Sequence, residues 1–184
     1  MLRKYSRKLK LTVACALIAL VGAAVGGWSY RERNASLRLE LLDDARRSSV
    51  AFDSAELSRL AGAPNDVGTP VYRGVKDRLR RLKTVDQRVR NVYILRVQPE
   101  TGKVVFLADA TLTGTSNEAV PGNEFIQASR LPGLQDVMRT GLPITEGPLA
   151  DALGTWVTAF AIIGPAGANR EILGVDVDAA GWRR

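Results

Sequence analysis

The first thirty residues divide into a basic segment and an uncharged apolar segment. Residues 1–10 hold no acidic side chain, and their basic side chains are Arg3, Lys4, Arg7, Lys8 and Lys10. Residues 11–30 hold no charged side chain at all. Because a bilayer core of about 30 Å needs roughly 20 apolar helical residues, residues 11–30 are predicted to form a transmembrane helix. Basic residues stay on the cytoplasmic side, so we expect a cytoplasmic tail at 1–10 and an outer domain at 31–184.

Two other interpretations of this segment compete with a retained membrane anchor. A cleaved signal peptide has the same basic start, but its apolar run is usually about 7–15 residues long. Small residues that could serve as its cleavage site are present at Ala23, Ala24, Gly26 and Gly27. A lipidated Cys15 is disfavoured because only residues 11–14 separate it from Lys10. A retained anchor is the preferred interpretation, and cleavage of residues 1–30 stays open.

Two helical patterns follow the apolar segment. Residues 31–61 carry apolar side chains on one predicted helix face, at Leu37, Leu41, Ala45, Phe52 and Ala55. Thr69 and Pro70 form a helix start, because Thr caps a first turn and Pro suits the first helical position. The second helix is expected to run to about Thr84, with its basic side chains, Lys76 included, in solvent.

From residue 89 onward the pattern changes to strands. Residues 89–97 and 103–110 are rich in β-branched and apolar side chains and flank a turn at 99–102, which predicts a hairpin. Residues 153–163 and 171–177 predict a second hairpin, with short helical pieces over 123–140. Helices followed mostly by antiparallel strands indicate an α+β fold.

Composition narrows the range of functions. Of the net charge of +7, the first ten residues carry +5, so the remaining chain carries about +2, too little to predict a nucleic-acid partner. Histidine is absent and Cys15 is the single cysteine, so the outer domain has no disulfide and lacks the commonest general base and metal ligand. No phosphate-binding loop or zinc-type spacing occurs. We therefore expect no enzyme activity, no metal and no cofactor.

Several short strings carry a family resemblance. They are RNVYIL at 90–95, VVFLADA at 104–110, PGNEF at 121–125, EGPLADALGTWVTAFAII at 146–163 and ILGVDVDAAGW at 172–182. As a set they resemble the extracytoplasmic Cache or PAS-like (PDC-type) sensor domains of bacterial sensor histidine kinases, diguanylate cyclases and chemoreceptors. The resemblance implies a long N-terminal helix packed on a central antiparallel sheet of about five strands. It also implies a ligand pocket between one sheet face and the loops that cover it.

The resemblance points to five ligand-binding candidates, which are Arg90, Tyr93, Asp109, Trp156 and Asp176. One cationic, two anionic and two aromatic groups would suit a small polar organic ligand, with Arg90 holding a carboxylate. The chain lacks the Arg-x-x-x-Trp-Tyr string of amino-acid-binding Cache domains, which argues against a zwitterionic ligand.

Each of these candidates also has a structural interpretation. The two aromatic side chains can simply pack in the core, and Asp109 can bond its own turn. Asp176 and Asp178 share one strand face, since side chains alternate along a strand. Arg90 could therefore neutralise Asp176 instead of binding a ligand.

The functional hypothesis is a single-pass sensor of the bacterial inner membrane with its sensor domain in the periplasm. It would bind a small ligand and pass the signal across the membrane, as the input module of a two-component or cyclic-di-GMP receptor. A homodimer through the N-terminal helix and a separate output domain or partner are expected. The alternative is a periplasmic scaffold or interaction domain without a ligand. Whether the chain is part of a longer receptor stays open.

Overall fold

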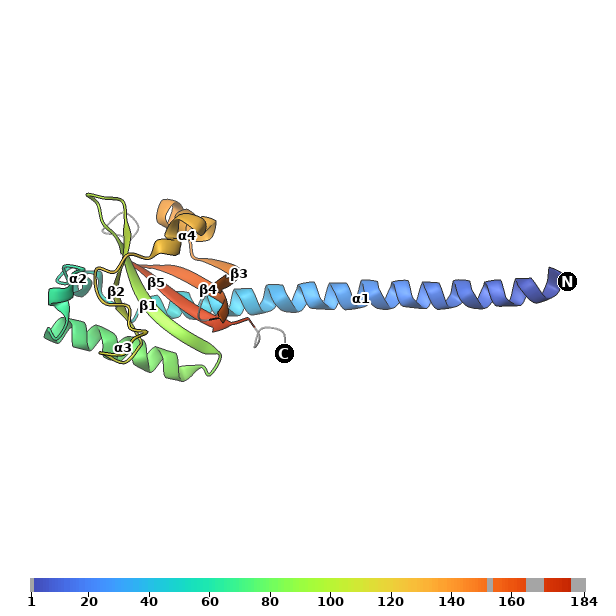
Figure 1. Ribbon diagram of the computed structural model, residues 1–184, viewed down its shortest axis with the longest axis horizontal. Helices are drawn as coiled ribbons and strands as arrows, with labels where there is room; N and C mark the ends of the chain where they lie inside the picture. The colour runs from blue at the N-terminus through green and yellow to red at the C-terminus, as the bar shows by residue number, and fades with distance from the viewer. Residues whose placement is uncertain (1, 152–153, 165–170, 180–184) are drawn as a thin grey trace. The chain divides into compact units, whose positions relative to one another are not determined.

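The computed structural model describes residues 2–151, 154–164 and 171–179. The chain divides into two compact units, Met1–Leu39 and Glu40–Arg184. Their helices and strands follow in the order α1, α2, η1, α3, β1, β2, η2, α4, β3, β4 and β5 (Figure 1). The predicted α+β class is confirmed.

Helix α1 (Leu2–Ser49) contains the apolar segment. Its part from Leu11 onward is long and apolar enough to cross a membrane, with a mean hydropathy of 2.1 over its most apolar 18 residues and none of that window buried. Large apolar side chains such as Leu11, Ile18 and Trp28 are more than two-thirds exposed. Burial in lipid is the ordinary way to remove such surface from water.

The last turns of α1 belong to the second unit, where Leu41 and Ala45 enter the core. The predicted helix over 31–61 is wrong in its final part, because α1 ends at Ser49. Asp53 has an extended backbone, and its carboxylate accepts a hydrogen bond from the Ala55 N–H at 2.9 Å to cap the short helix α2 (Ser54–Leu57). A side-chain cap of this kind starts a new helix rather than continuing the old one.

Helix α3 (Pro70–Val85) starts as predicted. The Thr69 hydroxyl accepts a hydrogen bond from the Tyr72 N–H at 3.2 Å, and Pro70 occupies the first turn. The apolar face of α3 buries Val75 and Leu79 fully. This helix therefore packs on the sheet through a stripe of the expected 3.6-residue period.

Five antiparallel strands form one sheet, in the order β2-β1-β5-β4-β3. Their bounds are Val89–Val97 for β1, Val104–Asp109 for β2, Ile144–Asp151 for β3, Gly154–Ile163 for β4 and Glu171–Asp178 for β5. The pairing of β1 with β2 confirms the first predicted hairpin. Strands β4 and β5 also pair antiparallel, as predicted. Residue 153, the predicted first residue of β4, and residues 165–170 of the predicted β4–β5 turn lie outside the described residues.

Strand β3 is absent from the sequence-based expectations. It is an edge strand whose centre contains Gly147 and Pro148, joined by a cis peptide bond. Proline is tolerated at a sheet edge because its missing N–H costs no ladder hydrogen bond there. In a sequence, however, a Gly-Pro pair indicates a turn, which is why the strand was not predicted.

The two faces of the sheet carry separate apolar clusters. One cluster joins the end of α1, α2 and α3 to the sheet, and the other joins η2 (Ile126–Arg130) and α4 (Pro132–Thr140) to it. Helices α3 and α4 accordingly lie on opposite sides of the sheet (Figure 1). Pro132 starts α4 rather than interrupting it, and Gly141 ends the helix with a left-handed backbone, φ 75°.

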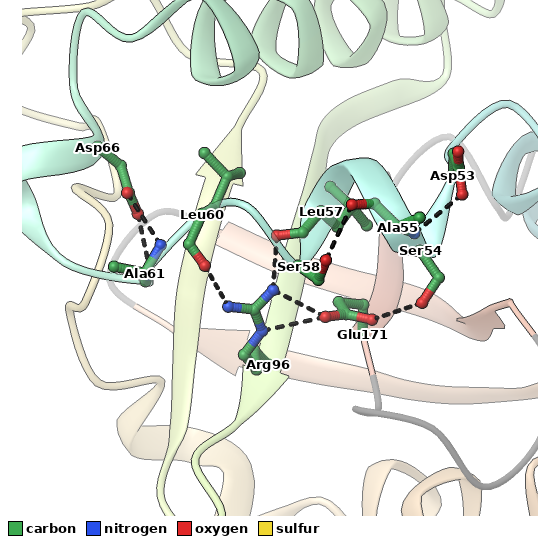
Figure 2. Close-up of polar contacts among 11 residues, drawn as sticks. Asp53, Ser54, Ala55, Leu57, Ser58, Leu60, Ala61, Asp66, Arg96 and Glu171 are labelled. Atoms are coloured by element: carbon green, nitrogen blue, oxygen red, sulfur yellow. Dashed lines mark hydrogen bonds and ion pairs between the residues drawn. The ribbon is translucent and has the colours of Figure 1, made fainter.

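A buried ion pair fastens α2 to the sheet (Figure 2). The Arg96 guanidinium donates to the Glu171 carboxylate at 2.8 Å and to the carbonyl oxygens of Leu57 and Leu60 at 2.8 and 2.6 Å. The Ser54 hydroxyl donates to the second Glu171 oxygen at 3.3 Å. We call these five residues the Arg96 cluster. Since Glu171 is fully buried, the charge is tolerated only because it is paired and hydrogen-bonded.

Candidate functional site

A cavity of about 310 Å³ opens on the sheet face that carries α4 and η2. Its aromatic lining side chains are Tyr93, Phe106, Phe125 and Trp156. Its polar and charged lining side chains are Asn91, Asp109, Asn117, Glu124, Gln127, Thr158 and Asp176. We call this cavity the sheet pocket. Its volume lies at the lower end of the range for small-molecule sites, about 300–1,000 Å³.

The pairing of the strands determines which residues form the floor of the sheet pocket. Asp176 of β5 lies opposite Asn91 of β1 on one side and Thr158 of β4 on the other. Two residues earlier on β5, Gly174 lies opposite Tyr93. Because side chains alternate along each strand, these residues project from the same face.

Gly174 is required by the Tyr93 ring. A Cβ atom at position 174 would overlap that ring and would lie 2.9 Å from its hydroxyl oxygen. The glycine therefore leaves space for the Tyr93 ring beside β5. The ring in turn carries its hydroxyl to Asp176.

Asp176 accepts two hydroxyl hydrogen bonds. Tyr93 donates at 3.1 Å and Thr158 at 2.7 Å, both to Oδ1. These bonds stabilise the carboxylate at the pocket floor, since hydrogen bonds to a charged acceptor are shorter and stronger than neutral ones. They also hold the Asp176 side chain in one orientation at the pocket floor.

Three rings form an aromatic wall. The Tyr93 ring meets Phe106 at a centroid distance of 5.6 Å and Phe125 at 6.0 Å, and the last two lie 5.4 Å apart. The Tyr93–Phe106 and Phe106–Phe125 contacts have edge-to-face geometry, which favours such pairs. Phe125 lies in the segment that follows the 111–122 loop. Its backbone N–H donates a hydrogen bond to the Val104 carbonyl oxygen, which attaches this segment to β2.

Asp109 connects the sheet pocket to α3. Its fully buried carboxylate accepts from Lys76 Nζ at 3.1 Å, and Lys76 Nζ also donates to Glu118 at 2.6 Å. The predicted solvent exposure of Lys76 is wrong, because its side chain is only 6% exposed. Burial of this ammonium is offset by two carboxylates. Asp109 is therefore an ion-pair partner at the pocket wall, rather than the isolated turn residue considered from the sequence.

Two pKa values respond to this network. Burial raises the pKa of the Glu118 carboxyl, but hydrogen bonds from Lys76 and the Gly114 N–H outweigh it, and the net direction is down. Burial, together with the Glu118 charge, raises the pKa of the Tyr72 hydroxyl far above its ordinary value. Tyr72 donates to Glu118 at 3.2 Å, so a charged Glu118 and a neutral Tyr72 support one another.

Arg90 lies outside the sheet pocket. Its side chain is 58% exposed, and its guanidinium contacts the Asp178 carboxylate at 3.4 Å. The expectation that Arg90 neutralises Asp176 is wrong, since Asp178 takes that place. Tyr93, Asp109, Trp156 and Asp176 do line one cavity, and whether they bind a ligand stays a prediction.

Sequence reasoning missed Asn91 and Thr158. Both follow from period two, because Asn91 lies two residues before Tyr93 and Thr158 two residues after Trp156. Arg90 lies at the irregularity of the β1–β5 pairing between Val89 and Asn91, and its side chain contacts Asp178. Glu124, Phe106 and Phe125 had no such local signal, because tertiary packing of the 121–125 segment on β2 brings them to the pocket.

Among the described residues, no group of three or more His, Cys, Asp or Glu side chains is placed to hold a metal ion. The carboxylates of the sheet pocket are instead held by hydroxyl, ammonium and backbone N–H donors.

Comparison with known proteins gives a structural likeness. No protein-family model matches the sequence, and no curated protein matches it. The structure is similar to the extracellular domain of mmHK1S-Z2, a protein assigned as a histidine kinase, with a TM-score of 0.51 and 13% identity over 87% of this chain and 60% of that one. The chain therefore shares the fold of that extracellular domain.

Two structures of a chemoreceptor align with lower TM-scores. The sensory domain of the Campylobacter jejuni chemoreceptor Tlp3 aligns with a TM-score of 0.45 and 15% identity, over 85% of this chain and 66% of that chain. A Tlp3 ligand-binding domain in complex with L-valine aligns at 0.44 and 17%, over 84% and 63%. The chain spans less than two-thirds of the length of each of these structures.

Proposed function

We propose that this chain is the sensor module of a bacterial membrane receptor and binds a small polar organic ligand in the sheet pocket. The observation that supports this most is a concave site in which polar groups from β1, β2, β4 and β5 converge beside four aromatic rings. Pockets of this composition are the usual location of small-molecule binding. The sensor-domain fold agrees with this role, and the proposal includes no catalytic step in this chain.

The proposal places the sensor in the periplasm, held by one crossing of the inner membrane. Residues 1–10 would face the cytoplasm, because basic residues are retained there. Alkaline phosphatase fused after residue 184 should be active, and a cytoplasmic reporter fused at the same place inactive. The reverse pattern would overturn this topology.

Signal passage is proposed to run through α1, which contributes Leu41 and Ala45 to the domain core and also contains the apolar segment. A homodimer through α1 and an output domain or partner on the cytoplasmic side would receive the signal.

A thermal-shift screen of the full chain in detergent against small metabolites tests ligand binding. A ligand that binds only the folded state raises the unfolding midpoint by mass action. The pocket-filling variant Ala150→Trp, at an exposed lining position of β3, should abolish the shift, and Arg90→Gln, outside the pocket, should keep it. Absence of any hit would favour the alternative of a scaffold without a ligand.

A further inference from the structure

One wall of the sheet pocket is a loop that two carboxylates hold in place. Residues 111–121, which we call the pocket loop, contribute Asn117 and Ala119 to the pocket lining. Among the described residues, every hydrogen bond between this loop and the rest of the domain involves Glu118 or Asp109. The position of the pocket loop therefore depends on these two side chains.

Lys76 joins the two carboxylates. Its Nζ donates to Glu118 Oε1 at 2.6 Å and to Asp109 Oδ1 at 3.1 Å, and the three side chains are at most 6% exposed. The other Asp109 oxygen accepts a hydrogen bond from the Ala119 N–H at 3.3 Å. One ammonium group thus holds the pocket loop directly through Glu118 and indirectly through Asp109.

Lys76 belongs to a helix on the other face of the sheet. Its helix, α3, packs through Val75 and Leu79 into the cluster on the face opposite α4. Asp109 ends the edge strand β2 and lies opposite Tyr93, which lines the pocket. The contact between Lys76 and Asp109 therefore joins α3 on one face to the sheet pocket on the other, at the edge of the sheet.

Opening of the pocket loop would break a buried ion pair. Hydrogen bonds to charged groups are about twice as strong as those between neutral groups when the donor is also charged and the distance is short. The Lys76 bond to Glu118 is of this kind, whereas Tyr72 donates a neutral hydroxyl to the same oxygen at 3.2 Å. Lys76 should therefore contribute more than Tyr72 to holding the loop.

We propose that Lys76 is a positioning residue of the sheet pocket and holds the pocket loop in place from the opposite face of the sheet. Opening of the loop breaks the Lys76–Glu118 bond. By thermodynamic linkage, a ligand that contacts Asn117 or Ala119 and favours the closed loop also favours this contact with α3. The inference rests on the proposed ligand-binding function for its role in sensing, but its test needs no ligand.

Amide hydrogen exchange at residue resolution, on the full chain in detergent, tests this role because the protection factor of an amide reports how often its segment opens. The reporter is the Ala119 amide, whose acceptor Asp109 is left unchanged. Glu118→Ala keeps Lys76 paired with Asp109 and should lower the Ala119 protection factor about ten-fold or more. The amide of Leu173, fully buried in the central strand β5, should keep its protection.

Two substitutions test which donor holds Glu118. Lys76→Met should lower the Ala119 protection factor by at least as much as Glu118→Ala. Adding Glu118→Ala to it should lower the protection little further, because both substitutions break the same bond. Tyr72→Phe should have a clearly smaller effect. If Lys76→Met does not fold, the comparison of Glu118→Ala with its control decides the inference.

The matched control is Glu56→Ala. It also removes a carboxylate that pairs with a cation of α3, Arg78, but it lies outside the pocket loop. The Ala119 protection factor should therefore stay unchanged in this variant.

Four results would overturn the inference. They are unchanged Ala119 protection in Glu118→Ala, an equal loss at Leu173 in that variant, an equal loss at Ala119 in Glu56→Ala, and a loss in Tyr72→Phe as large as in Lys76→Met. The second and third would mean general destabilisation, and the last would assign the loop to the Tyr72 hydroxyl. None of them bears on whether the pocket binds a ligand, which the metabolite screen decides separately.

Discussion

The Arg96 cluster and the sheet pocket are both centres of polar side chains within the same domain, and they differ in their partners. In the Arg96 cluster, each guanidinium nitrogen donates to a protein oxygen, and both Glu171 oxygens accept (Figure 2). In the sheet pocket, the Asn91 oxygen has no hydrogen-bond partner within the described part of the chain, and the residue lines a cavity. A centre whose groups satisfy one another indicates a structural role, whereas an unsatisfied acceptor beside a cavity indicates a binding role.

The largest expected effect is a loss of folding stability when the Arg96–Glu171 pair is broken. The Arg96 side chain is only 11% exposed, and Glu171→Ala removes the carboxylate that pairs with its guanidinium. Removal of one partner of a buried pair costs about 3–5 kcal/mol of the free energy of unfolding. Urea unfolding of the full chain in detergent measures this loss.

The matched control replaces both charges. In Arg96→Met with Glu171→Leu no buried charge is left alone, so the double variant should recover most of the stability that Glu171→Ala loses. A loss below about 1 kcal/mol for Glu171→Ala, by the standard of an exposed pair, would show that the cluster is not a structural centre.

The second effect concerns the pocket floor. Gly174→Ala should destabilise the fold by about 1–3 kcal/mol, because the new methyl group overlaps the Tyr93 ring in a packed region. It should also weaken ligand binding, since Tyr93 positions Asp176.

Gly74→Ala is the control of opposite sign. A Cβ atom at position 74 would have a Glu56 oxygen as its nearest neighbour, at 3.9 Å, and Ala is favoured over Gly within a helix by about 1 kcal/mol. Equal effects of the two substitutions would contradict the proposed role of Gly174.

Much of the fold follows from the sequence, for identifiable reasons. The β-branched run gives β1, and Thr69 with Pro70 gives the start of α3, because these signals are local. The end of α1 at Ser49 was missed because a single Asp cap decides it. The edge strand β3 was missed because its central Gly-Pro pair indicates a turn in a sequence.

The site was predictable where strand parity sufficed. Tyr93, Trp156 and Asp176 reach the pocket, and the same parity rule would have replaced Arg90 with Asn91. Lys76 could not be predicted, because its burial depends on Asp109 and Glu118, which lie 33 and 42 residues away along the chain.

A smaller effect is expected from pH. The pKa of Glu118 is lower in the folded state, so its contribution is fully present above its ordinary value of 4.5 and is lost as pH falls through the lower folded value. The pKa of the Asp86 carboxyl is also lowered, by hydrogen bonds from Arg88, so its contribution has the same sign and is lost as pH falls below the ordinary value of 3.8. Urea midpoints measured from pH 6 to pH 3 should therefore fall most steeply below about 4.5. Glu118→Gln should flatten this acid decline, and an unchanged slope in that variant would count against the Lys76–Glu118 bond.

The smallest expected effect belongs to Arg90, the residue that the sequence favoured as a ligand contact. Its pair with Asp178 has side chains 58% and 33% exposed, and exposed pairs contribute about 0–1 kcal/mol because water and salt screen them. Arg90→Gln should therefore change the free energy of unfolding by less than about 1 kcal/mol, and Asp178→Asn should do the same. In a double-mutant cycle the two should couple by no more than that amount. Ligand affinity should stay unchanged in Arg90→Gln, measured by calorimetry with a ligand found in the metabolite screen. A ten-fold loss of affinity in this variant, with an unchanged unfolding midpoint, would return Arg90 to the binding site.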